Sequence, residues 1–83
     1  ISKVCIGSLI EEILFDLEDK IANKNLSVNF IKDEDLCLQT DDTLLQRLLF
    51  NIIENAIKYN NENGSIEIIT KKEKCNTIIE ISL

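Results

Sequence analysis

Hydrophobic residues recur with helical spacing in the first third of the chain. Between Ser8 and about Lys24 the apolar positions follow a period near 3.6 residues and fall within one arc of a helical wheel. Ser8 is the expected N-cap of this helix, with Glu11 as its capping-box partner. Phe15 lies outside the apolar arc, among acidic residues. The arc itself consists of Ile10, Ile13, Leu14, Leu17 and Ile21.

A second helix is predicted from a cap at Thr40 or Asp41 to about Tyr59, and its apolar arc is much broader. The arc covers more than half of the circumference, which predicts burial on most sides of the helix. The remaining polar stripe is narrow and contains Arg47, Asn51, Glu54 and Lys58, with Asn55 at its margin. The broad arc is formed by Leu45, Leu48, Leu49, Ile52, Ile53, Ala56 and Ile57.

Short apolar or alternating stretches outside these helices predict strands. They lie at 4–6, 27–31, 36–39, 65–71 and 77–83, and the last two are expected to form a hairpin. The resulting order is strand, helix, two strands, helix, two strands. We therefore predict an α+β fold, a two-layer α/β sandwich with two main helices packed on one face of a mixed sheet.

Length and charge limit the classes of function. A chain of 83 residues suits one small domain, and an apolar share of 45% is enough to form a core. The net charge of −6 argues against general binding of nucleic acid or anionic lipid, which both require a basic surface. No apolar run approaches the roughly 20 residues that cross a bilayer. The first residue is Ile rather than Met, so we expect the chain to be an excised part of a longer protein.

The three cysteines are Cys5, Cys37 and Cys75. They are far apart, they form no C-x-x-C pair, and the chain contains no histidine. This spacing is not that of a zinc site or of a disulfide framework. We therefore expect three separate, reduced thiols that act as small apolar residues.

The segment 51–59 carries the candidate chemistry. Asn51, Asn55 and Lys58 occupy neighbouring turns of the second helix, so their side chains can meet at one place. An asparagine carbonyl oxygen is a hard ligand of the kind that suits Mg²⁺, and a lysine ammonium can meet a phosphate as a point charge. Tyr59 offers an aromatic edge to a base or a sugar. The alternative interpretation is that these residues are simply the solvated face of the helix.

This segment resembles the N box of sensor histidine kinases, which belong to the Bergerat-fold group of ATPases. The flanking segments are also similar to the family: 41–47 resembles the acidic helix start before the box, and 61–66 resembles the turn and strand after it. Residues 12–26 resemble the first helix of the family. The resemblance therefore covers nearly the whole chain.

The resemblance implies a role for each residue of the motif. It makes Asn55 the Mg²⁺ ligand that bridges the ATP phosphates and places Asn51 near the same phosphates. It places Lys58 at the phosphates and Tyr59 at the ribose or adenine. It provides no catalytic residue within the chain. An amide at Asn51 cannot act as a general base, which fits phosphoryl transfer to a histidine better than hydrolysis.

The family pattern continues with elements that the chain lacks. These are an aspartate-glycine box, a lid, a second glycine box and the phosphorylatable histidine; the only glycines here are Gly7 and Gly64. We therefore expect residues 1–83 to be the N-terminal part of an ATP-binding catalytic domain, inactive by itself. The parent would be a two-component sensor kinase that binds Mg-ATP and phosphorylates a histidine in a helical hairpin, from which a response regulator takes the phosphoryl group.

Two further expectations concern location and assembly. The resemblance implies a cytoplasmic domain, in a family whose members are often anchored in the membrane. An open sheet edge or face predicts a homo-oligomer, because unpaired strand edges recruit other chains. The alternative function is a non-enzymatic dimerisation or interaction module with a degenerate nucleotide site.

Overall fold

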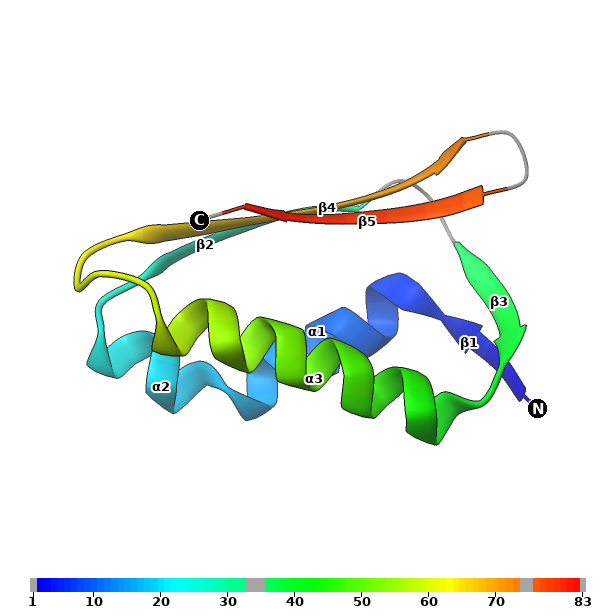
Figure 1. Ribbon diagram of the computed structural model, residues 1–83, viewed down its shortest axis with the longest axis horizontal. Coiled ribbons are helices and arrows are strands. Elements are labelled where there is room, and N and C mark those ends of the chain that lie inside the picture. The colour runs from blue at the N-terminus through cyan, green and yellow to red at the C-terminus, as the bar shows by residue number, and fades with distance from the viewer. Residues whose placement is uncertain (1, 33–35, 74–75, 83) are drawn as a thin grey trace.

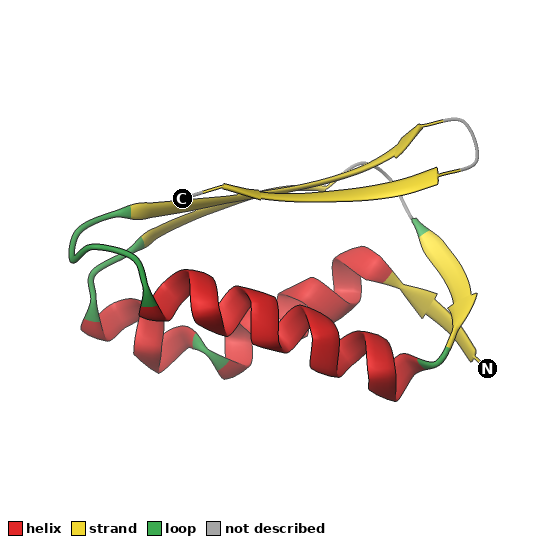
Figure 2. Ribbon diagram, viewed as in Figure 1, coloured by secondary structure: helices red, strands yellow, loops and turns green. Residues whose placement is uncertain are grey.

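The computed structural model describes residues 2–32, 36–73 and 76–82. Helices form one layer and a three-stranded sheet forms the other (Figures 1 and 2). None of the helices in these ranges is long and apolar enough to cross a membrane. The elements in chain order are β1 (Ser2–Cys5), α1 (Ile6–Asp16), α2 (Glu18–Asn23), β2 (Ser27–Lys32), β3 (Cys37–Thr40), α3 (Asp42–Lys58), β4 (Ser65–Glu73) and β5 (Asn76–Ser82).

The main sheet has the strand order β2-β4-β5 and is mixed. β2 runs parallel to β4, whereas β4 and β5 form the predicted antiparallel hairpin. The parallel register places Val28 beside Ile66 and Phe30 beside Ile68, so that these side chains share the face covered by the helices. β1 and β3 pair in a separate antiparallel ladder at one end of the molecule (Figure 1). The predicted α+β two-layer fold is therefore confirmed.

The core lies between the sheet and the helices. α1 and α3 pack side by side beneath the sheet and contribute their apolar stripes to it (Figure 1). Burial of these side chains is the main favourable term in the folding of so small a domain. The largest fully buried side chains are those of Ile6, Ile10, Ile13, Ile53, Ile66, Ile68 and Thr70.

The first helix differs from the prediction at its start and near its middle. It begins at Ile6, after Cys5, with no side-chain cap, so Ser8 lies within the helix and is not its N-cap. Its first turn is held instead by the backbone N–H of Ile6, which donates to the carbonyl of Leu36 at 2.8 Å. The predicted single helix is also divided, because Leu17 adopts φ −100° and ψ 8° between α1 and α2. A capping motif read from local sequence cannot include a partner that is 30 residues away.

The second predicted helix is confirmed as α3, and Asp41 is its N-cap. The Asp41 carboxylate accepts a hydrogen bond from the backbone N–H of Leu44 at 3.1 Å. Such a cap contributes about 1 kcal/mol to helix stability. The expectation that α3 is buried on most sides is wrong. Leu44 is 63% exposed, Leu48 56% and Ile52 42%, because no element in the described part of the chain covers that side.

The cysteines also differ from the prediction. The β1–β3 ladder places Cys5 directly opposite Cys37, and the two residues form a disulfide with a Cα–Cα distance of 3.9 Å. The prediction of separate thiols is therefore wrong for this pair. Cross-strand neighbours are close in space however far apart they are in sequence, and spacing along the chain does not reveal them. Cys75 lies outside the described residues.

Candidate functional site

The polar residues of the N-box-like segment lie on the outer face of α3. Asn51, Asn55 and Lys58 are all exposed. The opposite side of the same helix is anchored in the core by Leu49, Ile53, Ala56 and Ile57. Because a helix is rigid over these three turns, the buried side fixes the direction in which the exposed side chains project. The structure therefore brings the two asparagines and the lysine to one face, as the sequence predicts.

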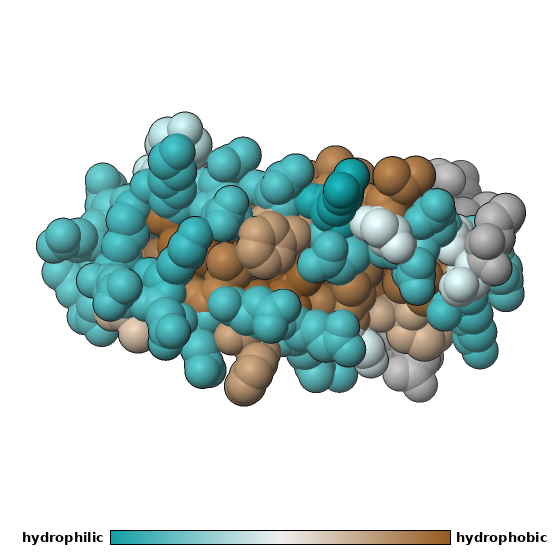
Figure 3. Space-filling view, turned by 90° about the horizontal axis from the view of Figure 1, so that it is seen from below, coloured by the Kyte–Doolittle hydropathy of each residue, from teal (hydrophilic) through white to brown (hydrophobic). Residues whose placement is uncertain are grey.

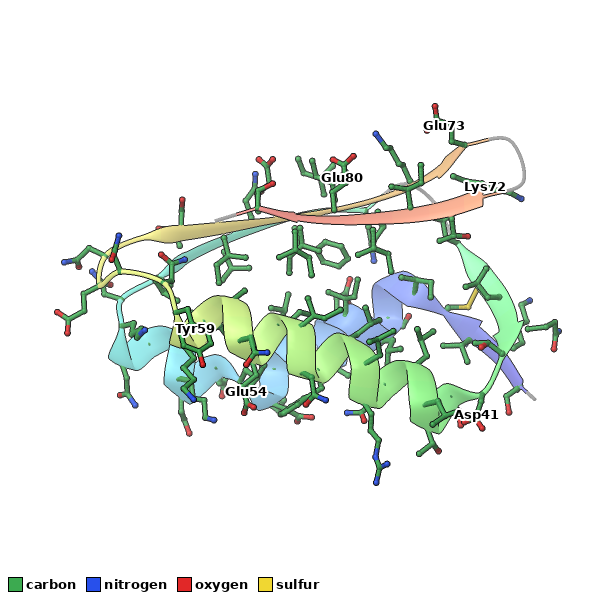
Figure 4. The ribbon with its side chains drawn as sticks, in the orientation of Figure 1. Asp41, Glu54, Tyr59, Lys72, Glu73 and Glu80 are labelled. Atoms are coloured by element: carbon green, nitrogen blue, oxygen red, sulfur yellow. A yellow bond between two sulfur atoms is a disulfide. The ribbon has the colours of Figure 1, made fainter. Side chains whose placement is uncertain are left out.

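Tyr59 follows α3 as its C-cap residue and is 71% exposed. Figure 4 shows it at the end of α3, at the opposite end from Asp41. The Lys58 Nζ atom lies 5.3 Å from the centre of the Tyr59 ring, within the range of a cation–π contact. A positive charge and an exposed aromatic ring therefore stand together at this end of the helix. This pair of groups is suited to a ligand that carries both a phosphate and a planar base.

Glu54 belongs to the polar stripe of α3 and forms an ion pair with the neighbouring helix α2. Its carboxylate accepts a hydrogen bond from the Lys20 Nζ atom of α2 at 2.8 Å. Glu54 is labelled on the outer side of α3 in Figure 4. The ion pair links α2 to α3, and both partners are partly exposed, so its contribution to stability is at most about 1 kcal/mol.

A pocket of about 420 Å³ lies between α2 and α3. Two of its three lysines already have partners: Lys20 is bonded to Glu54, and Lys24 donates to backbone carbonyls at the end of α3. Neither Asn51 nor Asn55 lines it. The pocket is therefore separate from the asparagine row and shares only Lys58 with the predicted site. Its lining residues are Lys20, Asn23, Lys24, Glu54, Ile57 and Lys58.

An apolar groove of about 430 Å³ lies on the other side of the asparagine row, between α3 and β5. Exposed Leu48 and Ile52 form part of its wall, and on a helical wheel they stand next to Asn51 and Asn55. On the helical side of the molecule, Figure 3 shows hydrophobic surface framed by hydrophilic side chains. The full lining consists of Leu45, Leu48, Leu49, Ile52, Thr77, Ile79 and Ile81.

The donor chemistry of the asparagine row fits a Mg²⁺ ion that is shared with phosphates. Magnesium sites in phosphate-binding proteins use one or two protein oxygens and fill the other positions with phosphate oxygens and water. Asn55 offers one exposed amide oxygen of this kind. Within the described ranges, no three His, Cys, Asp or Glu side chains gather as a separate metal cluster. The assignment of Asn55 as a metal ligand stays a prediction.

Sequence reasoning missed one residue that shapes this site. Lys24 marked the expected end of the first helix. Its Nζ atom reaches the carbonyls of Ile57 and Lys58 in the last turn of α3 and that of Asn60 just after it, 33 to 36 positions further along the chain. No local pattern reports such a contact. It becomes visible only when α2 and α3 are placed side by side.

These features define a small α+β domain with a solvated N-box-like helix face, and comparison with known proteins agrees. No model of a known protein family matches the chain. The chain is 32% identical over 82 residues to the adaptive-response sensory kinase SasA of Prochlorococcus marinus (strain MIT 9215) and 35% identical over 80 residues to the histidine protein kinase SaeS of Staphylococcus epidermidis. These alignments include 98% and 94% of the chain, and 22% of each relative.

Solved structures show the same relationship in three dimensions. The catalytic domain of the histidine kinase ThkA superposes with a TM-score of 0.91 at 28% identity, over 96% of this chain and 55% of that one. ThkA has also been solved in complex with the response regulator protein TrrA, and that structure matches with a TM-score of 0.89. The chain is thus a homologue of histidine kinase catalytic domains. It corresponds to about half of one such domain and to about a fifth of the curated relatives' length.

Proposed function

We propose that this chain forms the N-box part of the ATP-binding catalytic domain of a two-component sensor histidine kinase. The observation that carries the proposal is the exposed row of Asn51, Asn55 and Lys58 on a helix whose other side is buried. The homology to SasA, SaeS and ThkA supports it. In the complete protein, the domain would bind Mg-ATP and transfer the γ-phosphoryl group to a histidine.

Each residue of the row has a part in this proposal. Asn55 would supply an amide oxygen to a Mg²⁺ ion shared with the phosphates, and the ion would neutralise charge on the transferred group. Asn51 would lie beside the phosphates. Because an amide is not a general base, it would not activate a water molecule for hydrolysis. Lys58 would meet a phosphate, and Tyr59 would contact the ribose or adenine. The site therefore favours transfer to a protein acceptor over hydrolysis.

The proposal extends to partners and location. The acceptor would be a histidine on a helical hairpin, as the resemblance to sensor histidine kinases implies. A response regulator would then take the phosphoryl group, in line with the solved complex of ThkA with TrrA. We place the domain on the cytoplasmic side, where ATP is available and where Cys5 and Cys37 would be kept reduced, so that the disulfide would belong to the oxidised form of the chain. By itself the 83-residue chain would be inactive, because it corresponds to about half of a complete catalytic domain.

A nucleotide titration tests this function. A fluorescent ATP analogue is titrated into the full-length protein that contains this chain, and separately into the 83-residue chain, with Mg²⁺ and with EDTA. We expect micromolar, Mg²⁺-dependent binding to the full-length protein and little or none to the chain alone. Absence of binding to the full-length protein contradicts the kinase assignment. Micromolar binding to the isolated chain contradicts its inactivity.

A second candidate function, self-association, is favoured by a different observation. Leu44, Leu48 and Ile52 are exposed beside the apolar groove under β5, and β5 is an edge strand of the sheet. Exposed apolar side chains next to an unpaired strand edge form a surface that a second copy can cover. The 83-residue chain is therefore expected to form a homodimer through this face or edge.

Replacing Leu48 with glutamate tests this association. A charge buried in an apolar interface is costly, so we expect the Leu48→Glu chain to be monomeric in analytical ultracentrifugation while the unmodified chain is dimeric. The matched control is Phe15→Glu, because Phe15 is also strongly exposed but does not line the groove. A monomeric unmodified chain at high concentration, or equal dissociation of both variants, would contradict this interface.

A further inference from the structure

We infer that Lys24 is a positioning residue for the nucleotide site, because it holds the end of the helix that carries Asn55, Lys58 and Tyr59. The inference rests on the proposed function and adds a residue that lies outside the N-box-like segment. Lys24 follows α2 as its C-cap residue and is half-buried against the end of α3.

The contacts of the Lys24 ammonium group are unusually complete. Its Nζ atom donates to the carbonyl oxygens of Ile57 at 3.0 Å, Lys58 at 2.5 Å and Asn60 at 2.8 Å. A lysine ammonium has three hydrogens, and each has an acceptor here. The last carbonyls of a helix lack partners within the helix and carry the negative end of its dipole. Lys24 therefore adds hydrogen bonds and a positive charge at the carbonyls of Ile57 and Lys58, the first of which also accepts from the backbone N–H of Asn60 at 3.3 Å.

The backbone beside Lys24 strengthens the same connection. The Lys24 carbonyl accepts a hydrogen bond from the backbone N–H of Asn63 at 2.8 Å. The Asn25 side-chain amide donates to the Asn63 side-chain oxygen at 2.6 Å. Both asparagines have positive φ angles, 51° and 61°, a conformation that asparagine adopts more readily than most residues. The turn after α2 and the turn after α3 thus hold each other at several points.

This arrangement has a consequence for the ligand-binding residues. Lys58 is bonded to Lys24 through its carbonyl, while its side chain is exposed and lies over the Tyr59 ring. Fixing the Lys58 backbone fixes the direction of the Lys58 and Tyr59 side chains relative to Asn55, one turn earlier. Because Nζ of Lys24 is occupied by carbonyls, it is not a phosphate ligand. Its effect on the nucleotide is exerted through the backbone of α3.

The test uses the full-length protein and three substitutions. Lys24→Met keeps the length of the side chain and removes the charge and the donors. Lys24→Arg restores a charge and donors. Lys20→Met is the matched control, since Lys20 lies one turn earlier and makes only the partly exposed ion pair with Glu54. Affinity for the fluorescent ATP analogue with Mg²⁺ is measured well below each variant's melting temperature.

We expect Lys24→Met to weaken Mg-nucleotide binding by about tenfold, the scale seen when groups that orient metal ligands are removed. Lys24→Arg is expected to recover much of the affinity, and Lys20→Met to match the unmodified protein. The side-chain amide NMR signals of Asn55 should show smaller shifts on addition of Mg-ATP in Lys24→Met. If Lys24→Met does not fold, Lys24→Gln, which retains a neutral donor, is tested in the same way with an intermediate loss expected.

The outcomes separate the positioning role of Lys24 from the proposed nucleotide-binding function. A lower melting temperature with unchanged nucleotide affinity in Lys24→Met would show a purely structural role and overturn the inference, while the proposed function stands. Loss of affinity in Lys24→Met and in Lys20→Met alike would also overturn it, because the effect would not be specific to the capped carbonyls. Absence of nucleotide binding to the unmodified full-length protein would contradict both the proposed function and the positioning role of Lys24.

Discussion

Replacing Asn55 with aspartate in the full-length protein is expected to weaken Mg-ATP binding by about 100-fold, which corresponds to about 2.7 kcal/mol. The substitution keeps the size of the side chain and adds a negative charge beside the triphosphate. Two like charges about 4 Å apart repel by about 4 kcal/mol at an effective dielectric constant near 20, and attraction to Mg²⁺ offsets part of this. Titration with a fluorescent ATP analogue measures the loss, and autophosphorylation should fall with it.

The matched control is Asn29→Asp, which makes the same change of charge on an exposed position of β2. Asn29 alternates with Val28 and Phe30, whose side chains face the core, so it lies on the outer face of the sheet, away from α3. Its variant should bind nucleotide like the unmodified protein. Because Asn55 is exposed, its replacement should leave the melting temperature unchanged. Undiminished nucleotide binding in Asn55→Asp would contradict the role proposed for the α3 face and favour an interaction module.

Reduction of the Cys5–Cys37 disulfide is expected to lower the melting temperature of the 83-residue chain by about 15 °C. A cross-link between residues separated by 32 positions restricts the unfolded chain by about 3.5 kcal/mol in the loop-entropy estimate. At about 4 °C for each kcal/mol in a domain of this size, this gives the expected shift. Thermal unfolding followed by circular dichroism, with and without dithiothreitol, measures it.

Two variants show whether the effect belongs to this pair. The double variant Cys5→Ser, Cys37→Ser should melt near the reduced protein and should no longer respond to dithiothreitol. Cys75→Ser should retain the full response. If the melting temperature of the unmodified chain is the same under oxidising and reducing conditions, the two thiols do not form a stabilising cross-link in solution.

Much of the fold could be predicted from the sequence, because its elements are marked by local patterns. The periodic apolar residues located both helices, and Asp41 was one of the two expected caps of α3. Alternation along 65–71 and 77–83 predicted the hairpin. The prediction of Ser8 as the N-cap was wrong, because the helix begins at Ile6. The backbone N–H of Ile6 bonds to the carbonyl of Leu36, a contact between segments that are far apart in the sequence.

The candidate site was predicted in part, again because local spacing along the chain marks it. Asn51, Asn55 and Lys58 are separated by helical intervals, so their common face follows from the spacing. Their exposure does not follow from it. The breadth of the apolar arc suggested a buried helix, whereas the packing of α1 and the sheet leaves Leu48 and Ile52 uncovered beside the asparagine row.

The sequence by itself determined the order of helices and strands, the α+β class and the residues of the N-box-like face, because these depend on spacing within a few turns or strand residues. Only the tertiary structure decided the Cys5–Cys37 pairing, the division of the first helix at Leu17 and the cap that Lys24 provides for α3. The disulfide and the Lys24 cap join groups that are 32 to 36 positions apart along the chain. Their proximity is set by how the helices pack on the sheet, a collective result of burial that no short stretch of sequence encodes.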